Sequence, residues 1–460
     1  MKNYSSNIRL ISLLGWALCL FWTSTGAAQE APAARLDSTE REKVDIDNAD
    51  VWQVLQGTGD EITQRLIGNV ELSQDSIYMY ADSADLVNSV QLYAYDNVII
   101  QQGDSIAAFS DRLDYNAEDK IAHLRRNVIL QNGDRELYTD ALTYDLATKL
   151  ATYTTGGRLT DGDTELRSTY GYYYGDTDQI YFRDSVVVVG EEFEMRADTL
   201  RYDATNETVH FLGPTVIRTD TAEIYCEAGY YKVEDEIAVF RNNAQYRSGE
   251  QIATADSITY RGDLGTYFLD GNAYVREGDE RLARAKRIRI KREEEIYELQ
   301  GNGLFIDSTR TVRGDTIKVD QSQNTYSVSG GQPEVIDGTM ILSAKDIDFD
   351  EASGIGRARG NVIWRDTSAN LEIQAERADY NEATGYLKAS GGRGDRPLLI
   401  TLLEGDSLFV TADTLFSREV YVTDEANTTS SSKTSLIDTL TSDSISINTL
   451  SYLDSTVQDT

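Results

Sequence analysis

A six-residue pattern recurs along most of this chain, and it limits the fold more than any other feature. Clear copies read Ala197-Asp-Thr-Leu-Arg-Tyr202 and Ala255-Asp-Ser-Ile-Thr-Tyr260. Aligned copies begin at residues 81, 110, 139, 168, 197, 226, 255, 285, 314, 344, 375 and 412, a spacing of about 29 residues. Such a period means that each copy is one structural unit, and that neighbouring units stack to bury their apolar surfaces.

Within each copy, apolar and polar positions alternate. The fourth position is a large aliphatic residue in most copies and the sixth is often Tyr, whereas the fifth is usually polar, as in Asp114, Arg201 and Lys318. Side chains of a strand alternate between its two faces, so the fourth and sixth positions share one face. The pattern therefore predicts a strand with one dry face.

Turn residues and a second motif complete the repeat. Asn116, Asp203 and Asn381 follow the sixth position, and Asn and Asp favour turns. A second short strand is expected next, and then a corner such as Gly68-Asn69 or Gly271-Asn272 that opens a third strand. Gly and Asn tolerate positive φ, so they mark a bend that other residues resist.

These elements predict an all-β chain. No stretch of residues 57–425 keeps the 3.6-residue periodicity of a long helix. The expected fold is an elongated two-sheet β-jellyroll or solenoid of about twelve repeats, each adding one rung to each sheet. Residues 29–56 are interpreted as a linker. Residues 426–460 include 17 Ser or Thr and are interpreted as a solvated tail, or as one more marginal strand near Ser435–Leu453.

The N-terminus has the order of residues that an export signal requires. Lys2 and Arg9 precede an apolar run over residues 10–21, and Ala27 and Ala28 follow. Residues 1–28 are therefore predicted to be a signal peptide, and no later segment has the ~20 apolar residues of a membrane helix. If Cys19 leaves with the signal, no internal disulfide is expected.

Charge and composition exclude several function classes. The chain has 43 Lys and Arg against 77 Asp and Glu, a net charge of −34, which is opposite to a nucleic-acid binder. Two His and two Cys leave little for a zinc or iron–sulfur site. The Asp that recurs at the second position is interpreted as capping strand corners rather than binding calcium. No enzymatic activity, metal or cofactor is expected.

The small-Asp-x-aliphatic-x-Tyr segment, followed by Gly-Asn-Val, resembles the OstA/LptA family over residues 57–425. This family includes periplasmic lipopolysaccharide-transport proteins and the N-terminal domain of LptD. The resemblance implies a twisted jellyroll whose sheets enclose an apolar groove for acyl chains. It also implies a periplasmic location, with association with the outer membrane as one option, and end-to-end strand pairing with other proteins of a transport bridge.

A lipid groove would be lined by the apolar positions of the repeats. Tyr suits such a wall, because its ring contacts acyl chains while its hydroxyl reaches a polar rim. The alternative is that the same side chains fill a closed core. The predicted lining residues are Val98, Ile100, Leu113, Tyr115, Val128, Leu130, Leu142, Tyr144, Val186, Val188, Leu200, Tyr202, Ile258, Tyr260, Ile288, Ile347, Phe349, Val362 and Trp364.

One segment breaks the acidic trend. Seven cations lie between residues 281 and 292 without an intervening acid. Arg287, Arg289 and Lys291 are candidates for contacting a headgroup phosphate, since Arg offers a bidentate fork. The alternative is a solvated strand face paired with neighbouring acids.

Together these features predict an exported protein that binds, transports or bridges lipopolysaccharide or a related glycolipid for outer-membrane assembly. The rival interpretation is a structural or adhesive β-solenoid without lipid cargo. A sheet separation that admits acyl chains would favour the first, and a sealed coil would favour the second.

Overall fold

The computed structural model describes residues 43–422, apart from residues 58, 60, 103–105, 133–134, 161, 233, 309, 392–393, 395 and 404, and also residues 432–438. The predicted signal peptide over residues 1–28 lies outside the described residues, as do residues 29–42 of the predicted linker and most of the predicted tail. The described chain divides into two compact units.

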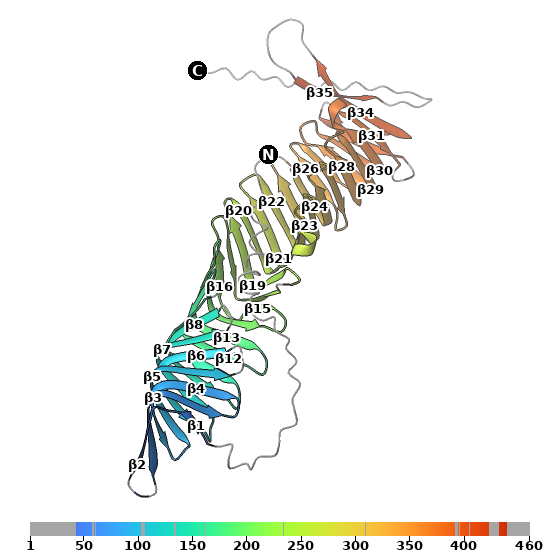
Figure 1. Cartoon of the computed structure of the whole chain (residues 1–460). Coiled ribbons are helices and arrows are strands. Elements are labelled where there is room, and N and C mark those ends of the chain that lie inside the picture. The colour runs from blue at the N-terminus through green and yellow to red at the C-terminus, as the bar shows by residue number, and fades with distance from the viewer. Residues whose placement is uncertain are drawn as a thin grey trace, which may run out of the picture. The chain divides into compact units, whose positions relative to one another are not determined.

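The first unit comprises residues 1–249 and 261–263, and its described part is built of strands (Figure 1). The strands are β1 (Asp45–Asn48), β2 (Val51–Gln56), β3 (Ile62–Gln74), β4 (Ile77–Val87), β5 (Gln91–Gln102), β6 (Ile106–Asn116), β7 (Ile121–Asn132), β8 (Arg135–Asp145), β9 (Leu150–Tyr153), β10 (Gly157–Thr160), β11 (Glu165–Ser168), β12 (Tyr170–Tyr174), β13 (Gln179–Val189), β14 (Glu194–Asp203), β15 (Thr208–Phe211), β16 (Thr215–Arg218), β17 (Glu223–Cys226), β18 (Ala228–Lys232) and β19 (Ile237–Ser248).

The second unit comprises residues 250–260 and 264–460 and has the same kind of architecture. Its strands are β20 (Gln251–Arg261), β21 (Thr266–Glu277), β22 (Arg281–Lys291), β23 (Ile296–Asp307), β24 (Arg310–Asp320), β25 (Thr325–Ser329), β26 (Glu334–Asp337), β27 (Met340–Ser343), β28 (Asp346–Asp350), β29 (Ile355–Asp366), β30 (Leu371–Asn381), β31 (Tyr386–Ser390), β32 (Leu398–Leu403), β33 (Asp406–Thr411), β34 (Thr414–Val422) and β35 (Ser432–Asp438). Short 3₁₀ turns occur at Gly262–Leu264 and Glu382–Thr384. The all-β repeat fold is confirmed.

Most long strands are bent at a bulge, which makes one strand part of two sheets. β6 pairs antiparallel with β5 and β7, and the register of its pairing with β7 shifts between Phe109 and Arg112. The expected second and third short strands of a repeat are therefore usually one bent strand, as in β7. One repeat contains two such strands, as β6 and β7 show. A bulge bends a strand in this way because its extra residue breaks the ladder.

The corner of each bent strand joins the two sequence motifs of the repeat. The corner residues have positive φ, for example 49° at Asn272 after 76° at Gly271. The Nδ2 group of Asn272 donates to both carboxylate oxygens of Asp256, at 3.1 and 3.2 Å, and Asn97 and Asn127 donate likewise to Asp82 and Asp111. A Cβ on Gly271 would lie 2.1 Å from Asp256 Oδ2, which explains the glycine. At these three corners the recurrent Asp accepts from an Asn side chain, whereas Glu376, at the same position of a later copy, accepts from the backbone N–H of Asn361 at 3.5 Å.

The residue after the sixth position closes a tight turn. Asn116 Oδ1 accepts from the backbone N–H of Asp119, and Asp145, Asp203 and Asp320 accept from backbone N–H groups two or three residues ahead. Side chains of Asn and Asp replace a backbone acceptor in this way in Asx turns. The predicted turns are confirmed at these positions.

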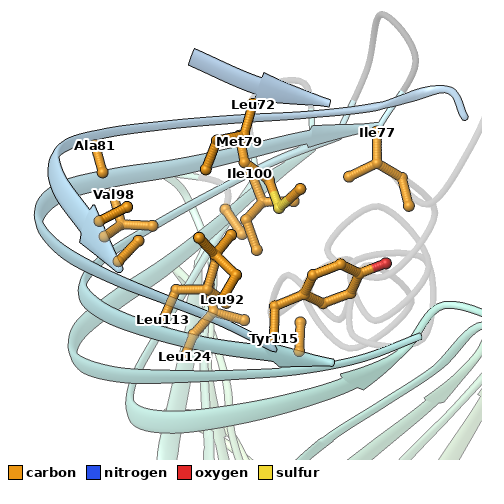
Figure 2. Packing of buried hydrophobic residues seen from close by; sticks show 14 of the residues in the cluster. Leu72, Ile77, Met79, Ala81, Leu92, Val98, Ile100, Leu113, Tyr115 and Leu124 are labelled. Carbon is orange, nitrogen blue, oxygen red and sulfur yellow. The ribbon is translucent and has the colours of Figure 1, made fainter. Parts of the chain in front are cut away.

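The interior of the first unit is a packed apolar layer between the two arms of the bent strands. Figure 2 shows Met79, Leu92, Val98, Leu113 and Tyr115 pointing into this space from successive strands. Leu92 is fully buried, and Leu113 and Tyr115 are only 2% and 1% exposed. The alternation along each strand therefore buries the predicted dry face.

Strands occur at both ends outside the expected repeat domain, and the one at the C-terminal end overlaps the strand that was the alternative near Ser435–Leu453. β1 and β2 lie within residues 29–56, which were expected to be a linker, and both pair with β3. β35 lies within the expected tail and pairs antiparallel with β34, from Ser432 opposite Val422 to Asp438 opposite Phe416. Hydrogen-bonded strands thus extend beyond residues 57–425 in both directions.

Candidate functional site

The predicted lining residues face the interior of their units. Leu130, Tyr144 and Phe349 are half-buried, and the other sixteen are buried. Those buried in the first unit are Val98, Ile100, Leu113, Tyr115, Val128, Leu142, Val186, Val188, Leu200 and Tyr202, and those buried in the second are Ile258, Tyr260, Ile288, Ile347, Val362 and Trp364. Burial alone does not distinguish a filled core from a binding groove, because both need apolar side chains.

An apolar cavity of about 140 Å³, here called cavity 1, lies inside the first unit. Four predicted residues line it: Ile100, Leu130, Leu142 and Tyr144. The sequence interpretation did not include several others that also line it, namely Ala108, Leu124, Leu137, Ala151, Tyr153, Leu159, Gly171, Tyr173, Ile180 and Phe182. Gln102 and Arg135 add polar groups to this mostly apolar lining.

Cavity 1 lies where the repeat departs from its own pattern. The copy that starts at residue 168 has Gly171 at the fourth position, where most copies have Leu or Ile. The ring of Tyr153 lies against this glycine, since a Cβ on Gly171 would be 2.0 Å from its Cε1 atom. The absent aliphatic side chain is thus replaced by a ring from a neighbouring strand.

A second apolar cavity of about 80 Å³, cavity 2, lies inside the second unit. The predicted residues Ile347, Phe349 and Trp364 line it, together with Val312, Val328, Val335, Leu342, Ala358, Ala378 and Leu387. Arg310 also contributes to its lining. Each unit therefore contains a cavity between its sheets.

In the first unit, neutral hydrogen bonds link tyrosines to glutamines from another strand end. Tyr115 Oη donates to Gln74 Oε1 at 2.6 Å, and Gln74 Nε2 donates to the carbonyl of Ala117 at 3.2 Å. One repeat later, Tyr144 Oη donates to Gln102 Oε1 at 3.2 Å. Burial raises the pKa of Tyr115 and Tyr144, so both remain neutral donors.

In the second unit the equivalent links are charged. Tyr297 Oη donates to Glu277 Oε1 at 2.8 Å, and Arg281 lies between Glu277, at 2.7 Å, and Asp307, at 3.8 Å. Burial, and then the carboxylate of Glu277, raise the pKa of Tyr297. The ring thus lies in the apolar interior while its hydroxyl reaches a charged group.

Arg310 repeats this arrangement 29 residues after Arg281. Its guanidinium contacts Asp337 Oδ2 at 2.9 Å and also pairs with Glu351, and it lies 4.6 Å from the ring centroid of Phe349 and 5.6 Å from that of Tyr326. Its side chain is only 14% exposed. Burial lowers the pKa of Arg310, but the hydrogen bond to Asp337 and the nearby charges outweigh burial and raise it. A positively charged guanidinium, fixed by two carboxylates, therefore borders cavity 2.

The three cations proposed as phosphate ligands already have carboxylate partners. Arg287 pairs with Asp270, Arg289 pairs with Glu298 at 3.0 Å, and Lys291 pairs with Glu294 at 2.9 Å. These pairs match the alternative interpretation of the segment, in which a solvated strand face pairs with neighbouring acids. A phosphate contact at these residues stays a prediction that requires the pairs to open.

Within residues 43–422 and 432–438, gaps excepted, no three side chains of His, Cys, Asp or Glu are grouped to hold a metal ion. Over the same ranges, no helix is long and apolar enough to cross a membrane. Cys226 is buried and unpaired, and burial raises its pKa to about 12.

Comparison with known proteins agrees with this architecture of bent strands and an apolar interior. Residues 41–198 match the family described as OstA-like protein. Residues 176–283 match the family described as LptA/(LptD N-terminal domain) LPS transport protein. The two matches overlap and define a repeat protein of the OstA/LptA type. Residues 41–283 are thus similar to the OstA/LptA-like families, and the resemblance drawn from the motifs is confirmed.

Among solved structures, the chain is similar to LptH from Pseudomonas aeruginosa. That protein is described as the LptA homologous periplasmic component of the conserved lipopolysaccharide transport device. The sequences are 18% identical, the match covers 23% of this chain and 79% of LptH, and the TM-score is 0.21. No curated protein matches the chain.

Proposed function

We propose that this protein is exported to the periplasm and carries lipopolysaccharide or a related glycolipid, with acyl chains inside its repeat units. The observation that carries this proposal is cavity 1, an apolar space between the sheets that side chains of the chain itself leave unfilled. The proposal draws further support from the match of residues 176–283 to a lipopolysaccharide-transport family.

The energetics of the interior suit an acyl chain. Each buried methylene group contributes about 0.8 kcal/mol, whereas burying an unpaired charge costs far more. Acyl chains therefore belong between the sheets and a charged headgroup belongs in water. A cavity of about 140 Å³ is close in volume to engineered apolar cavities that take up benzene. It thus accommodates a short length of chain, and a longer chain requires the sheets to separate further.

The test fills cavity 1 without changing the surface. Ala151 lines the cavity and is 6% exposed, so Ala151→Leu places three extra carbons in the space that the acyl chain would use. A photo-crosslinking amino acid at Leu142 reports the occupant in cells. We expect lipopolysaccharide adducts at Leu142 in the otherwise unchanged chain, and at least a fivefold loss of adducts in Ala151→Leu.

The matched control is Ala147→Leu, because Ala147 lies in an exposed turn of the same unit. It should leave the adducts unchanged. Absence of lipid adducts at Leu142 in the parent chain would contradict the proposal and favour the rival, a structural or adhesive solenoid. Equal adducts in both Ala→Leu variants would show that the lipid contacts Leu142 from outside cavity 1.

We further propose that the protein joins other bridge subunits end to end through β2. All six side chains of β2 are exposed, including Trp52 at 56% and Val54 at 67%. Among the described strands β2 pairs only with β3, so its other edge has free backbone groups. Uncovered strand edges of this kind accept a further strand.

A second copy of the chain is the simplest partner with which to test β2. Sedimentation should show association that strengthens with concentration, and Val54→Lys should weaken it at least tenfold, because a buried lysine at the new strand pair is costly. Phe409→Lys is the control, since Phe409 is similarly exposed, at 61%, on β33. A parent chain that stays monomeric, or equal weakening by both variants, would exclude self-pairing through β2.

A further inference from the structure

A row of aromatic side chains crosses the outer face of the first unit. Backbone pairing places Tyr172 of β12 opposite Tyr181 of β13, Tyr181 opposite Arg201 of β14, Arg201 opposite His210 of β15, and His210 opposite Tyr230 of β18. These five side chains, here called the aromatic row, therefore lie on one face of five consecutive strands. Neighbouring strands are ~4.8 Å apart, so the row spans roughly 19 Å.

The neighbours of the row in sequence show which face it occupies. Phe182, Leu200, Tyr202, Phe211 and Tyr231 are at most 3% exposed and point into the interior. Because strand side chains alternate, the aromatic row points away from the interior. All five of its members are half-buried, and Tyr174, two residues after Tyr172, is 41% exposed.

The rings form a surface rather than isolated contacts. His210 and Tyr230 have ring centroids 6.2 Å apart, and Tyr174 meets Tyr181 edge to face at 5.7 Å. Burial, and then the charge of Arg201, lower the pKa of His210, so its ring is uncharged at neutral pH. The rings thus present apolar faces to an incoming ligand.

The cations beside the row have no carboxylate partner. Within the described part of the chain, neither Arg201 nor Arg241 lies within ion-pair distance of an acid, and the buried Nε atom of Arg201 has no hydrogen-bond partner. The guanidinium of Arg241 lies 5.6 Å from the ring centroid of Tyr230. None of the five side chains of the row is acidic, and the charge of nearby Asp203 acts on His210.

We propose that the aromatic row binds the phosphorylated saccharide headgroup of the carried glycolipid, an inference that rests on the proposed function. Sugar rings present C–H groups that pack on aromatic faces, and tyrosine hydroxyls at the ring edges meet sugar hydroxyls. Arg201 and Arg241 match the phosphate groups, since a guanidinium binds them through two hydrogen bonds. A neutral or cationic ligand would provide no anionic partner for the guanidinium groups of Arg201 and Arg241.

The position of the row relative to cavity 1 favours a headgroup over a free saccharide. Gly171 and Tyr173 of β12, and Ile180 and Phe182 of β13, line cavity 1. Tyr181 is on the opposite face of β13 from Ile180 and Phe182. Tyr172, its partner in the row, itself contributes to the lining of cavity 1. The aromatic row thus borders the apolar site, and one amphipathic molecule would reach both.

The test uses the full chain and two probes. The first is the phosphorylated oligosaccharide obtained by complete deacylation of lipopolysaccharide, and the second is the same oligosaccharide after phosphatase treatment. Calorimetric titration should show that the double variant Tyr181→Ser/Tyr230→Ser binds the first probe at least tenfold more weakly than the parent chain. Arg201→Gln should weaken binding of the first probe about fivefold and leave the second unchanged.

The control is Tyr78→Ser/Tyr225→Ser, which removes two tyrosines on strands outside the row. It should bind as the parent does, and equal unfolding midpoints should show that all variants fold. Failure of the parent to bind the first probe, or equal binding by all variants, would overturn the proposal.

Adducts at Leu142 separate this inference from the proposed function. Loss of oligosaccharide binding in the row variant, with lipid adducts retained at Leu142, supports both proposals. Lipid adducts without any oligosaccharide binding by the parent chain overturn the aromatic row alone. Oligosaccharide binding without lipid adducts overturns the assignment to a glycolipid headgroup, because the ligand would then be a free saccharide.

Discussion

Leu92→Ala is expected to lower the free energy of unfolding of the first unit by about 4 kcal/mol. Leu92 lies in β5 with no exposed surface, opposite Leu86 on one side and Tyr115 on the other. Deleting its isobutyl group removes buried apolar area and leaves a space that the bent strands cannot close, because both arms of each strand are held by ladder hydrogen bonds. Equilibrium denaturation in urea measures the loss, and hydrogen exchange of the β4–β6 amides assigns it to these strands.

The matched variant is Leu137→Ala. Leu137 is an interior residue of β8, but it lines cavity 1 and is half-buried. A side chain beside an existing void has fewer contacts to lose, so we expect a smaller loss of about 1–2 kcal/mol. Equal losses in the two variants would mean that cavity 1 is filled or collapsed in solution, and would weaken the proposed lipid site.

The repeat itself was readable from the sequence because its signals are local. The alternation around Leu113 and Tyr115 and the turn residue Asn116 act within a few positions of each other, and the structure confirms the buried face and the turn. The corner at Gly271 and Asn272 was recognised from residue types that tolerate positive φ. The repeat period, the apolar face and the corner residues together were enough to predict the all-β fold.

Features that depend on pairing between distant residues were not readable. That two short strands merge into β7 depends on a bulge, which the sequence signals only as a corner. The partner of Tyr115 is Gln74, 41 residues earlier, and one sequence contains no sign of that pairing. Cavity 1 is lined by residues of several strands, among them Gly171 and Tyr153, which lie against each other. Its position therefore required the register of several strands, which no local pattern specifies.

The ion pairs of the cations between residues 281 and 292 also could not be predicted from the sequence, because they depend on pairing between strands. Arg289 lies in a run without acids, yet in space it faces Glu298 of the next strand. Cross-strand partners come from separate segments of an antiparallel repeat, so charge along the sequence differs from charge on the surface. For the same reason the aromatic row escaped notice: its members are one per strand and are never adjacent in sequence.

The second large effect is expected from Arg310→Met. The substitution keeps an unbranched apolar stem against Phe349 and Tyr326 but removes the charge that Asp337 and Glu351 share. The side chain of Asp337 is 30% exposed, so water relieves only part of the cost of leaving its carboxylate unpaired. We expect the free energy of unfolding of the second unit to fall by about 3 kcal/mol, measured by denaturation in urea.

Arg313→Met provides the control on the same strand. Arg313 pairs with Glu334 at 2.7 Å, but its side chain is 53% exposed, and an exposed pair contributes at most about 1 kcal/mol. Asp337→Asn in the Arg310→Met background should recover part of the loss, because it removes the unpaired charge while keeping the shape of the side chain. Salt should weaken the Arg313 pair more than the Arg310 pair, since screening acts on exposed charges. Equal losses for Arg310→Met and Arg313→Met would mean that the charged links at the edge of cavity 2 are open to water. The stability of the second unit would then come from its apolar interior. It would resemble the first unit in this respect, because the corresponding links of Tyr115 and Tyr144 are neutral.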